Sequence, residues 1–215
     1  MSEQVFINND FADVMLNRKS VRRFDPEFKI DREEIKEMIA QACSAPSACN
    51  LQSWHFVIVD QASGKEKLKD VTMPFNYPQL ETASAIVFVL GDTHSHKVYR
   101  EVWTKYCQEG RISEEKLQEV FSTFLPLYEN ASQEFLEKDA TLDGAMVAMQ
   151  LLLVARSHGY EANAWAGYKA ADLVTALDKD SQRYIPIMAI SIGKADETPI
   201  DSARYDTESL ISVLD

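Results

Sequence analysis

Three stretches of the chain are rich in β-branched and aromatic residues and are short enough to be single strands. They span residues 54–60, 85–91 and 187–192. Residues typical of turns close them, Asp60 after the first and glycines at the ends of the other two. Runs of this length and composition favour strands over helices. The first two read Trp-His-Phe-Val-Ile-Val and Ala-Ile-Val-Phe-Val-Leu, and the pattern predicts that they lie in the interior of a sheet.

Two helices are expected before the first strand. Residues 11–18 favour a short helix that leads into a basic cluster. A second helix should begin after Asp31, which can cap its N-terminus, with Glu34 at the third position as in a capping box. Its apolar residues recur on one face, and it should end near Ala45, because the residue before Pro46 disfavours helical geometry.

A third helical stretch, residues 141–157, is apolar on nearly every side. A helix of this kind must be buried all round, either in the core of one chain or in a subunit interface. The segment 96–138 before it is helical and highly charged, with Pro126 as its one clear break. The tail from about residue 194 to 215 has no apolar core of its own, and the whole chain, 1–215, is expected to form a single domain.

Composition excludes several classes of protein. The chain has 215 residues and a net charge of −12, which argues against a general nucleic-acid surface or an anionic membrane surface. No apolar run is long enough to span a bilayer, and residues 1–10 lack the core of a signal peptide, so we expect a cytoplasmic protein. The three cysteines lack CxxC spacing and favour reduced thiols, and no metal site is expected.

The glycine pattern restricts how the chain could bind a phosphate. No two glycines lie within three positions of each other, which excludes the GxGxxG fingerprint and the Walker loop. Any phosphate must therefore be held largely by side chains. Residues 18–23 carry four positive charges and one hydroxyl in an otherwise acidic chain, and arginine forks suit phosphate oxygens. The alternative is a solvated helix end, where basic residues are also favoured.

Four motifs in register resemble those of the FMN-dependent nitroreductase family. In this sequence they are Arg18-x-Ser20-x-Arg22-x-Phe24, Ala45-Pro46-Ser47-x-x-Asn50-x-Gln52-x-Trp54, Phe75-Asn76 and Ala164-Trp165-Ala166-Gly167-Tyr168. The second motif departs from the family pattern at two positions, with Ala48 where Ser is usual and Ser53 where Pro is usual. Order and spacing agree along nearly the whole chain, although the charged middle is not covered by any motif.

The resemblance implies an α+β fold, with a mixed, mainly antiparallel sheet flanked by helices, and an intertwined homodimer. It also implies FMN at two interface sites, NADH or NADPH as the second substrate, and a tail that reaches over the partner subunit. The apolar helix and the tail without a core are both consistent with such a dimer.

The resemblance further implies roles for individual residues around FMN. Arg18 and Ser20 would meet the phosphate with Lys19 close by, and Arg22 would reach the N1/O2 end of the ring, where reduction places negative charge. Asn76 would bind the pyrimidine edge. The other subunit would contribute Pro46, Ser47 and Asn50.

Three more residues complete the expected site. Ala166 and Gly167 would lie against the isoalloxazine, where small residues permit close approach. Arg204 is the candidate for a second phosphate contact, and Lys194 competes for that role. No side chain is expected to be catalytic, because flavin N5 is the reacting centre.

Structural alternatives stand beside these roles. Arg22 or Arg23 could simply pair with Asp25 or Glu27. Asn50 and Asn76 could be turn residues, and Trp54 and Trp165 are more typical of a core than of a stacking site.

The activity implied by the resemblance is a ping-pong reduction, in which hydride passes from NAD(P)H to flavin N5 and then to a small acceptor. Candidate acceptors are nitroaromatics, quinones, enones or free flavins. Two alternatives remain open. One is an enzyme on the same scaffold with another acceptor, such as a dehalogenase or a dihydropteridine reductase, and the other is a non-catalytic FMN-binding module.

Overall fold

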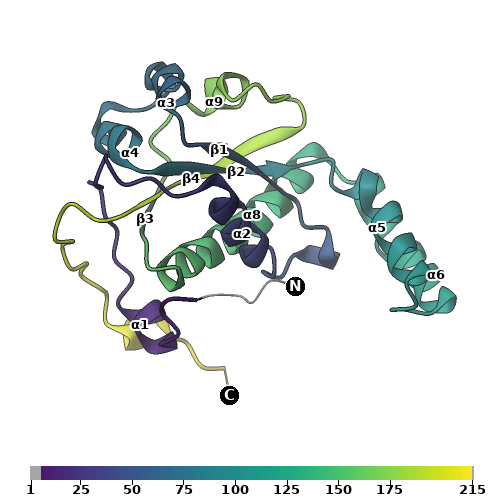
Figure 1. The fold of residues 1–215 in the computed structure, drawn as a ribbon. Coiled ribbons are helices and arrows are strands. Elements are labelled where there is room, and N and C mark those ends of the chain that lie inside the picture. The colour runs from purple at the N-terminus through teal and green to yellow at the C-terminus, as the bar shows by residue number, and fades with distance from the viewer. Residues whose placement is uncertain (1–5, 215) are drawn as a thin grey trace.

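The computed structural model describes residues 6–214 and is built around a four-stranded antiparallel sheet (Figure 1). Its strands are β1 (Trp54–Val59), β2 (Ala85–Asp92), β3 (Glu161–Trp165) and β4 (Tyr184–Gly193), in the spatial order β1-β2-β4-β3. The three strands expected from sequence are thus confirmed. β3 was not expected as a strand, and its last two residues overlap the fourth motif.

Helices cover both faces of this sheet, so the central strands are apolar on both sides. Every residue of β2 is buried. Val87, Val89 and Ile190 pack with α2 (Arg32–Ala42) and α8 (Gln133–Ser157) on one face, whereas Ile86 and Phe88 belong to a second core cluster on the other. This double covering explains why β2 shows a continuous apolar run instead of alternation. The nine α-helices of the described residues are α1 (Phe11–Leu16), α2 (Arg32–Ala42), α3 (Ala62–Lys67), α4 (Tyr77–Thr82), α5 (His96–Gln108), α6 (Glu114–Thr123), α7 (Leu125–Glu129), α8 (Gln133–Ser157) and α9 (Ala170–Ala176).

The four strands pair only in antiparallel fashion. A parallel contact to the sheet is made by a residue that lies outside these strands. Ser20 forms a single parallel bridge with Ala162 of β3, which brings the basic segment to the outer edge of the sheet. A second isolated bridge, antiparallel, joins Phe24 to Ala195 just after β4. A mixed, mainly antiparallel sheet was expected, and the bridge between Ser20 and Ala162 is its parallel contact.

Several helix ends differ from the sequence-based expectation. α1 ends at Leu16 and not at Arg18, because Asn17 already leaves helical geometry at its C-cap. α2 begins after Asp31, whose side chain caps it as expected, but it ends at Ala42, three residues before Ala45.

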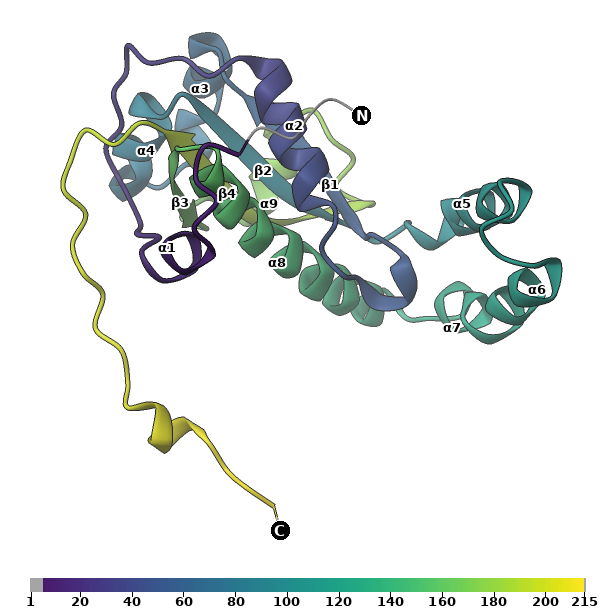
Figure 2. The same ribbon diagram turned by 60° about the horizontal axis from the view of Figure 1, so that its bottom comes forward.

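The charged middle is broken more often than Pro126 alone predicts. α5 and α6 are separated at residues 109–113, and Pro126 itself lies in the first turn of α7, a position that tolerates proline. Together α5, α6 and α7 form a helical arm that projects from the side of the sheet (Figures 1 and 2). The arm has a small core of its own, built around Tyr99, Leu125 and Tyr128.

Helix α8 starts at Gln133, eight residues earlier than expected, and it packs on the sheet and on α2. It is not buried all round within one chain, because Leu142 is 57% exposed and Met149 is 46% exposed. The tail after β4 runs away from the body as an extended strap (Figure 2). Among residues 6–214 no helix is long and apolar enough to cross a membrane.

Candidate cofactor site

The basic segment runs along the outer edge of the sheet and is joined to β3 by the single bridge at Ser20. Val21 and Phe24 are fully buried, whereas Ser20, Arg22 and Arg23 are exposed. Val21 and Phe24 are the apolar anchors of the segment, and the two arginines between them, Arg22 and Arg23, face solvent. The local fold therefore presents polar groups of this segment to solvent on a backbone tied to β3.

An ion-pair network holds the start of this segment. Arg156 of α8 donates to both carboxylate oxygens of Asp13 in α1, at 3.1 and 2.9 Å, and to Glu161 of β3 at 2.6 Å. Hydrogen bonds from Asn17, Arg156 and Asn8 lower the pKa of Asp13 to about 2. α1 is thereby connected to the helix and the strand beside which Arg18 emerges.

A hollow of about 380 Å³ lies between the basic segment and the tail. Ser20 and Arg22 line one side, and tail residues 197, 198 and 200–202 supply the other. The backbone N–H of Arg22 donates to Glu197 Oε1 at 2.5 Å, and Lys19 Nζ lies 2.5 Å from Asp201 Oδ1. Acidic side chains of the tail thus occupy the Lys19 ammonium, expected close to the phosphate, and the backbone N–H of Arg22, whose side chain was expected at the N1/O2 end of the ring.

Asn76 and Gly167 meet directly. A Cβ added to Gly167 would lie 1.8 Å from Asn76 Oδ1, and the Met73 N–H donates to the Gly167 carbonyl at 2.8 Å. Asn76 is only 4% exposed, yet its Oδ1 has no hydrogen-bond partner among the described residues. The third and fourth motifs are far apart in sequence, but the fold brings them into direct contact.

Two other buried acceptors lie in the same stretch of chain. Thr72 Oγ1 and Gln79 Oε1, like Asn76 Oδ1, find no partner within residues 6–214. Thr72 also bridges to Tyr168, next to Gly167. Buried polar atoms are rarely left unpaired in proteins, so this concentration indicates a polar ligand. Sequence analysis did not include Thr72, because a lone threonine carries no motif.

The second motif forms a strained loop between α2 and β1. Cys49, Asn50 and Gln52 have φ angles of 50°, 56° and 50°, in the left-handed region that non-glycine residues rarely adopt. The Tyr99 hydroxyl donates to the Cys49 carbonyl at 2.8 Å. In Figure 1 this loop lies beside the helical arm, on the side of the sheet away from α1. Within one chain the structure does not bring Ser47 and Asn50 to the basic segment.

The two tail candidates for a phosphate contact lie elsewhere. Lys194 Nζ donates to the Gly159 carbonyl at 2.5 Å and lies 4.8 Å from the centre of the Tyr160 ring. Arg204 is exposed and donates to the neighbouring Ala203 carbonyl. Neither residue lines the hollow beside Ser20 and Arg22.

The structural alternatives considered for the arginines and the tryptophans have different outcomes. Among the ion pairs of the described residues, none joins Arg22 or Arg23 to Asp25 or Glu27. Trp165 is buried and its Nε1 donates to Ser191 Oγ at 2.9 Å, as expected of a core residue.

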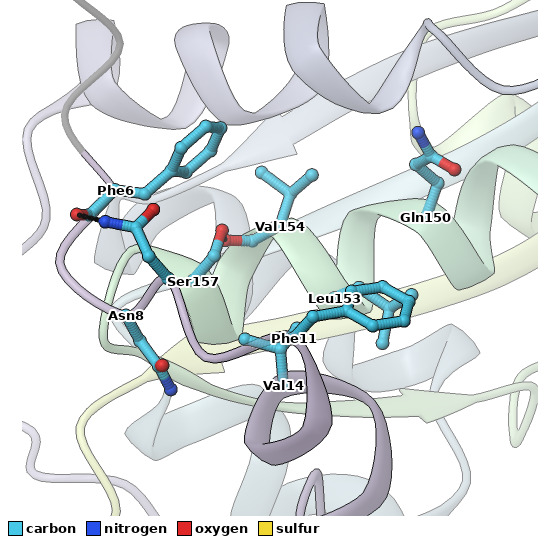
Figure 3. Close-up of a pocket in the computed structure, with 9 residues that line it drawn as sticks. Phe6, Asn8, Phe11, Val14, Gln150, Leu153, Val154 and Ser157 are labelled. Carbon is cyan, nitrogen blue, oxygen red and sulfur yellow. Dashed lines mark hydrogen bonds between the residues drawn. The ribbon is translucent and has the colours of Figure 1, made fainter.

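A second hollow, of about 280 Å³, lies between the N-terminal segment and α8 (Figure 3). Apolar side chains from α1 and α8 line much of it, including Phe11, Val14 and Leu153. It contains none of the residues predicted to bind a cofactor. Within residues 6–214 no three potential metal-ligating side chains form a cluster.

Comparison with known proteins gives the class of this fold and site. The family model described as the nitroreductase family matches residues 15–194, which include all four motifs. The chain belongs to the nitroreductase family. The family, the α+β nitroreductase-like fold and the assignment to the oxidoreductases are therefore confirmed.

Individual relatives refine this assignment. The chain is 56% identical over 216 residues to the "CLA biosynthesis enone reductase" of Lactiplantibacillus plantarum, covering 100% of both chains. It is 34% identical to YdgI, a candidate NAD(P)H nitroreductase of Bacillus subtilis (strain 168), over 94% of this chain and 96% of that one.

Solved structures agree with the sequence relatives. The crystal structure of CLA-ER, described as an enone reductase of gut-bacterial fatty acid saturation, superposes with a TM-score of 0.91 at 55% identity, covering 97% of this chain and 100% of that chain. A candidate nitroreductase from Exiguobacterium sibiricum 255-15, in complex with FMN, has a TM-score of 0.89 at 32% identity, covering 96% and 98%.

Proposed function

We propose that this protein is an FMN-dependent enzyme that uses NAD(P)H to reduce enones. The observation that carries the cofactor assignment is the buried, unpartnered Asn76 Oδ1 in contact with Gly167. The absence of a side chain at Gly167 lets Asn76 approach the backbone, and the unpaired Asn76 Oδ1 is an acceptor for a donor group of a flat polar ring. The FMN complex of the Exiguobacterium relative supports the same cofactor.

The residues present fit FMN. Arg18, Lys19 and Ser20 would hold the phosphate, since charged and hydroxyl donors suit its oxygens. Asn76 would accept from the pyrimidine edge, and Ala166 and Gly167 would lie against the ring. Arg204 remains the proposed second phosphate contact. It would have to approach from the extended tail.

FMN supplies the hydride chemistry when bound, accepting hydride from NAD(P)H and passing it to the acceptor in a ping-pong cycle. The chain supplies position and charge. Arg22 would set a fixed cation at the end of the ring that becomes negative on reduction. No protein acid or base is assigned to the reaction.

We further propose that the active unit is a cytoplasmic homodimer. Apolar residues Leu142 and Met149 of α8 are exposed in the single chain, and so are Ile211 and Leu214 of the tail. Contiguous exposed apolar surface is typical of an interaction site. In such a dimer Pro46, Ser47 and Asn50 would reach the flavin of the partner subunit, and the tail would cross over it.

An enone is the acceptor best supported among those considered. The relative at 56% identity is named an enone reductase, whereas the relatives named nitroreductases are less similar. Nitroaromatics, quinones and free flavins are the competing acceptors. A dehalogenase or dihydropteridine reductase on the same scaffold, or a non-catalytic FMN module, would differ in the assay that follows.

The test starts with the visible spectrum of the purified protein, followed by anaerobic addition of NADH or NADPH. We expect bound FMN that bleaches, and reoxidation by an enone at least tenfold faster than by a nitroaromatic of similar size. Faster reoxidation by the nitroaromatic would overturn the acceptor assignment. A flavin that is bound but never bleached would favour the non-catalytic module.

Two substitutions test the basic segment. We predict that Arg18→Ala and Arg22→Ala each weaken FMN binding at least tenfold, because a charge-assisted contact contributes about 1.5–3 kcal/mol. Fluorescence titration of the apoprotein with FMN measures the change. Arg23→Ala is the matched control, since Arg23 is an exposed neighbour outside the proposed site. Equal affinities in all three variants would remove this segment from the cofactor site.

A further inference from the structure

The loop that carries Ser47 and Asn50 is fastened to the middle of α8 by one buried carboxylate. Asp143 is 0% exposed, and its two oxygens accept from two different backbone groups of the loop. Oδ1 accepts from the Ala48 N–H at 2.9 Å, and Oδ2 accepts from the Ser53 N–H at 3.1 Å. The residue lies 95 positions along the chain from Ala48, so no motif connects them.

The stretch between these two N–H groups is the strained part of the loop. It contains Cys49, Asn50 and Gln52, all with positive φ. A non-glycine residue held in this region persists only where the surrounding structure determines its conformation, and such residues cluster at functional sites. Asp143 holds the stretch at both of its ends.

No cation neutralises this carboxylate among the described residues, since none of their ion pairs includes Asp143. Its hydrogen bonds come from neutral backbone N–H groups. A buried carboxylate is costly unless it is well bonded, and a neutral residue could pack here without that cost. What a carboxylate offers at this position, and an amide does not, is an acceptor on both of its oxygens.

We propose that Asp143 is a positioning residue for the cofactor: it fixes the left-handed loop so that Ser47 and Asn50 reach the flavin of the partner subunit. This inference rests on the proposed function. According to this inference, α8 both packs on the sheet and determines the conformation of the loop. Leu142 and Met149, which are exposed, belong to the same helix.

The loop has further supports that do not depend on Asp143. Ser47 Oγ accepts from the Gln52 N–H at 3.0 Å, and the Ser53 and Ser95 hydroxyls lie 2.8 Å apart. These contacts provide a control, because Ser53→Ala removes one of them while leaving the Ser53 N–H that binds Asp143.

The test is Asp143→Asn in the full-length protein. The amide keeps the shape of the side chain and one acceptor oxygen, but its NH₂ group faces the second backbone N–H, so two donors meet. We expect the FMN dissociation constant to rise at least tenfold in fluorescence titration. The Ser53→Ala control should stay within about threefold of the wild type, since it loses a single neutral hydrogen bond.

A second substitution separates positioning from general damage. Gln52 is exposed, and Gln52→Gly removes the cost of a side chain in the left-handed region. We expect the double variant Asp143→Asn/Gln52→Gly to recover at least threefold in FMN affinity over Asp143→Asn alone. The visible spectrum of the bound flavin should return towards that of the wild type.

Three outcomes decide the question. Tenfold weaker binding that Gln52→Gly partly restores supports the inference. Unchanged affinity in Asp143→Asn, with FMN bound by the wild type, overturns it, as does a loss that Gln52→Gly leaves untouched. A wild-type protein that does not bind FMN at all would instead overturn the proposed function, so the two failures are distinguishable.

Discussion

At the scale of single residues, Gly167 is the glycine of the site whose surroundings leave no room for a side chain. The space that a Cβ would need at Gly167 is already filled by the Asn76 carboxamide. Glycine is required here by contact and not by backbone conformation. The motif around Trp165 could identify Gly167 as a candidate site residue. The residue that excludes a larger side chain at this position is Asn76, which lies far earlier in the chain.

We predict that Gly167→Ala displaces Asn76 and weakens FMN binding at least tenfold. Overpacking of this kind also lowers the free energy of unfolding by about 1–3 kcal/mol. FMN titration and urea unfolding measure the two effects. Gly110→Asn is the control, because no atom lies within 4 Å of a Cβ at Gly110 and asparagine tolerates its positive φ. Equal flavin affinity in both variants would contradict the prediction.

Lys65 is a second residue whose surroundings determine its chemistry. It is 8% exposed, and its ammonium donates to the Ala83 carbonyl. Burial, together with repulsion from Lys29, lowers the pKa of Lys65 from 10.5 to about 8. Between these two values the unfolded chain binds more protons than the folded one, so this group makes the free energy of unfolding rise with pH.

The expected outcome concerns Lys65→Met compared with the wild type. The stability of the wild type relative to the variant should increase as pH rises from 8 to 10, because only the wild type loses the penalty of a buried charge. Urea unfolding at pH 7, 8, 9 and 10 measures it. Lys67→Met, a half-exposed lysine of the same helix, serves as control. Parallel pH profiles for the wild type and Lys65→Met would refute the prediction.

At the scale of elements, the parts predicted from sequence are those whose signal is local. The apolar runs of β1, β2 and β4 and the Asp31 cap of α2 could all be recognised from neighbouring residues. The start of α8 could not, because its first two turns are as polar as the arm before it. The left-handed loop at Cys49 and its fastening to Asp143 depend on contacts across the fold, which a single sequence does not display.

The tail shows the same limit at the candidate phosphate site. Lys19 and Arg22 could be identified from the sequence as candidate donors, but the acidic side chains that meet them, Asp201 and Glu197, could not. Nothing in the local sequence of the tail marks it as a neighbour of the basic segment. Their contact follows from the isolated bridge between Phe24 and Ala195.

From this contact we predict that Glu197→Gln strengthens FMN binding about threefold to tenfold at low salt. The amide oxygen can still accept from the Arg22 N–H, but a negative charge is removed from the place where the phosphate would bind. The gain should shrink as salt rises, since screening weakens the repulsion. Titrations at two ionic strengths measure it, with the exposed Glu208→Gln as control. Weaker binding would indicate that Glu197 supports the cofactor.

At the scale of the whole molecule, the single chain leaves the described part of its C-terminal tail uncovered. The tail carries apolar side chains with no partner surface of its own, and Leu214 is 99% exposed. The core predicted from sequence is present, and the surfaces that would complete it are those of the proposed homodimer. From the sequence, such surfaces can be recognised only indirectly, when the chain contains more apolar residues than a single copy of it can bury.

We predict that Ile211→Asp weakens the homodimer, because it places a charge within the apolar end of the tail. Sedimentation velocity across a concentration series should show the dimer dissociating at concentrations at least tenfold higher than for the wild type. Ser212→Asp adds the same charge at the adjacent polar position and should have a smaller effect. An identical shift in both variants would mean that charge alone, and not the lost apolar contact, is responsible.

The bridge between Ser20 and Ala162 has a consequence for aggregation. β3 ends the sheet, and its outer backbone groups would otherwise be open to pairing with a strand of another molecule. The segment proposed to hold the phosphate also shields that border. Detachment of this segment from β3 would expose a template for aggregation, so we expect substitutions that release it to lower the solubility of the protein.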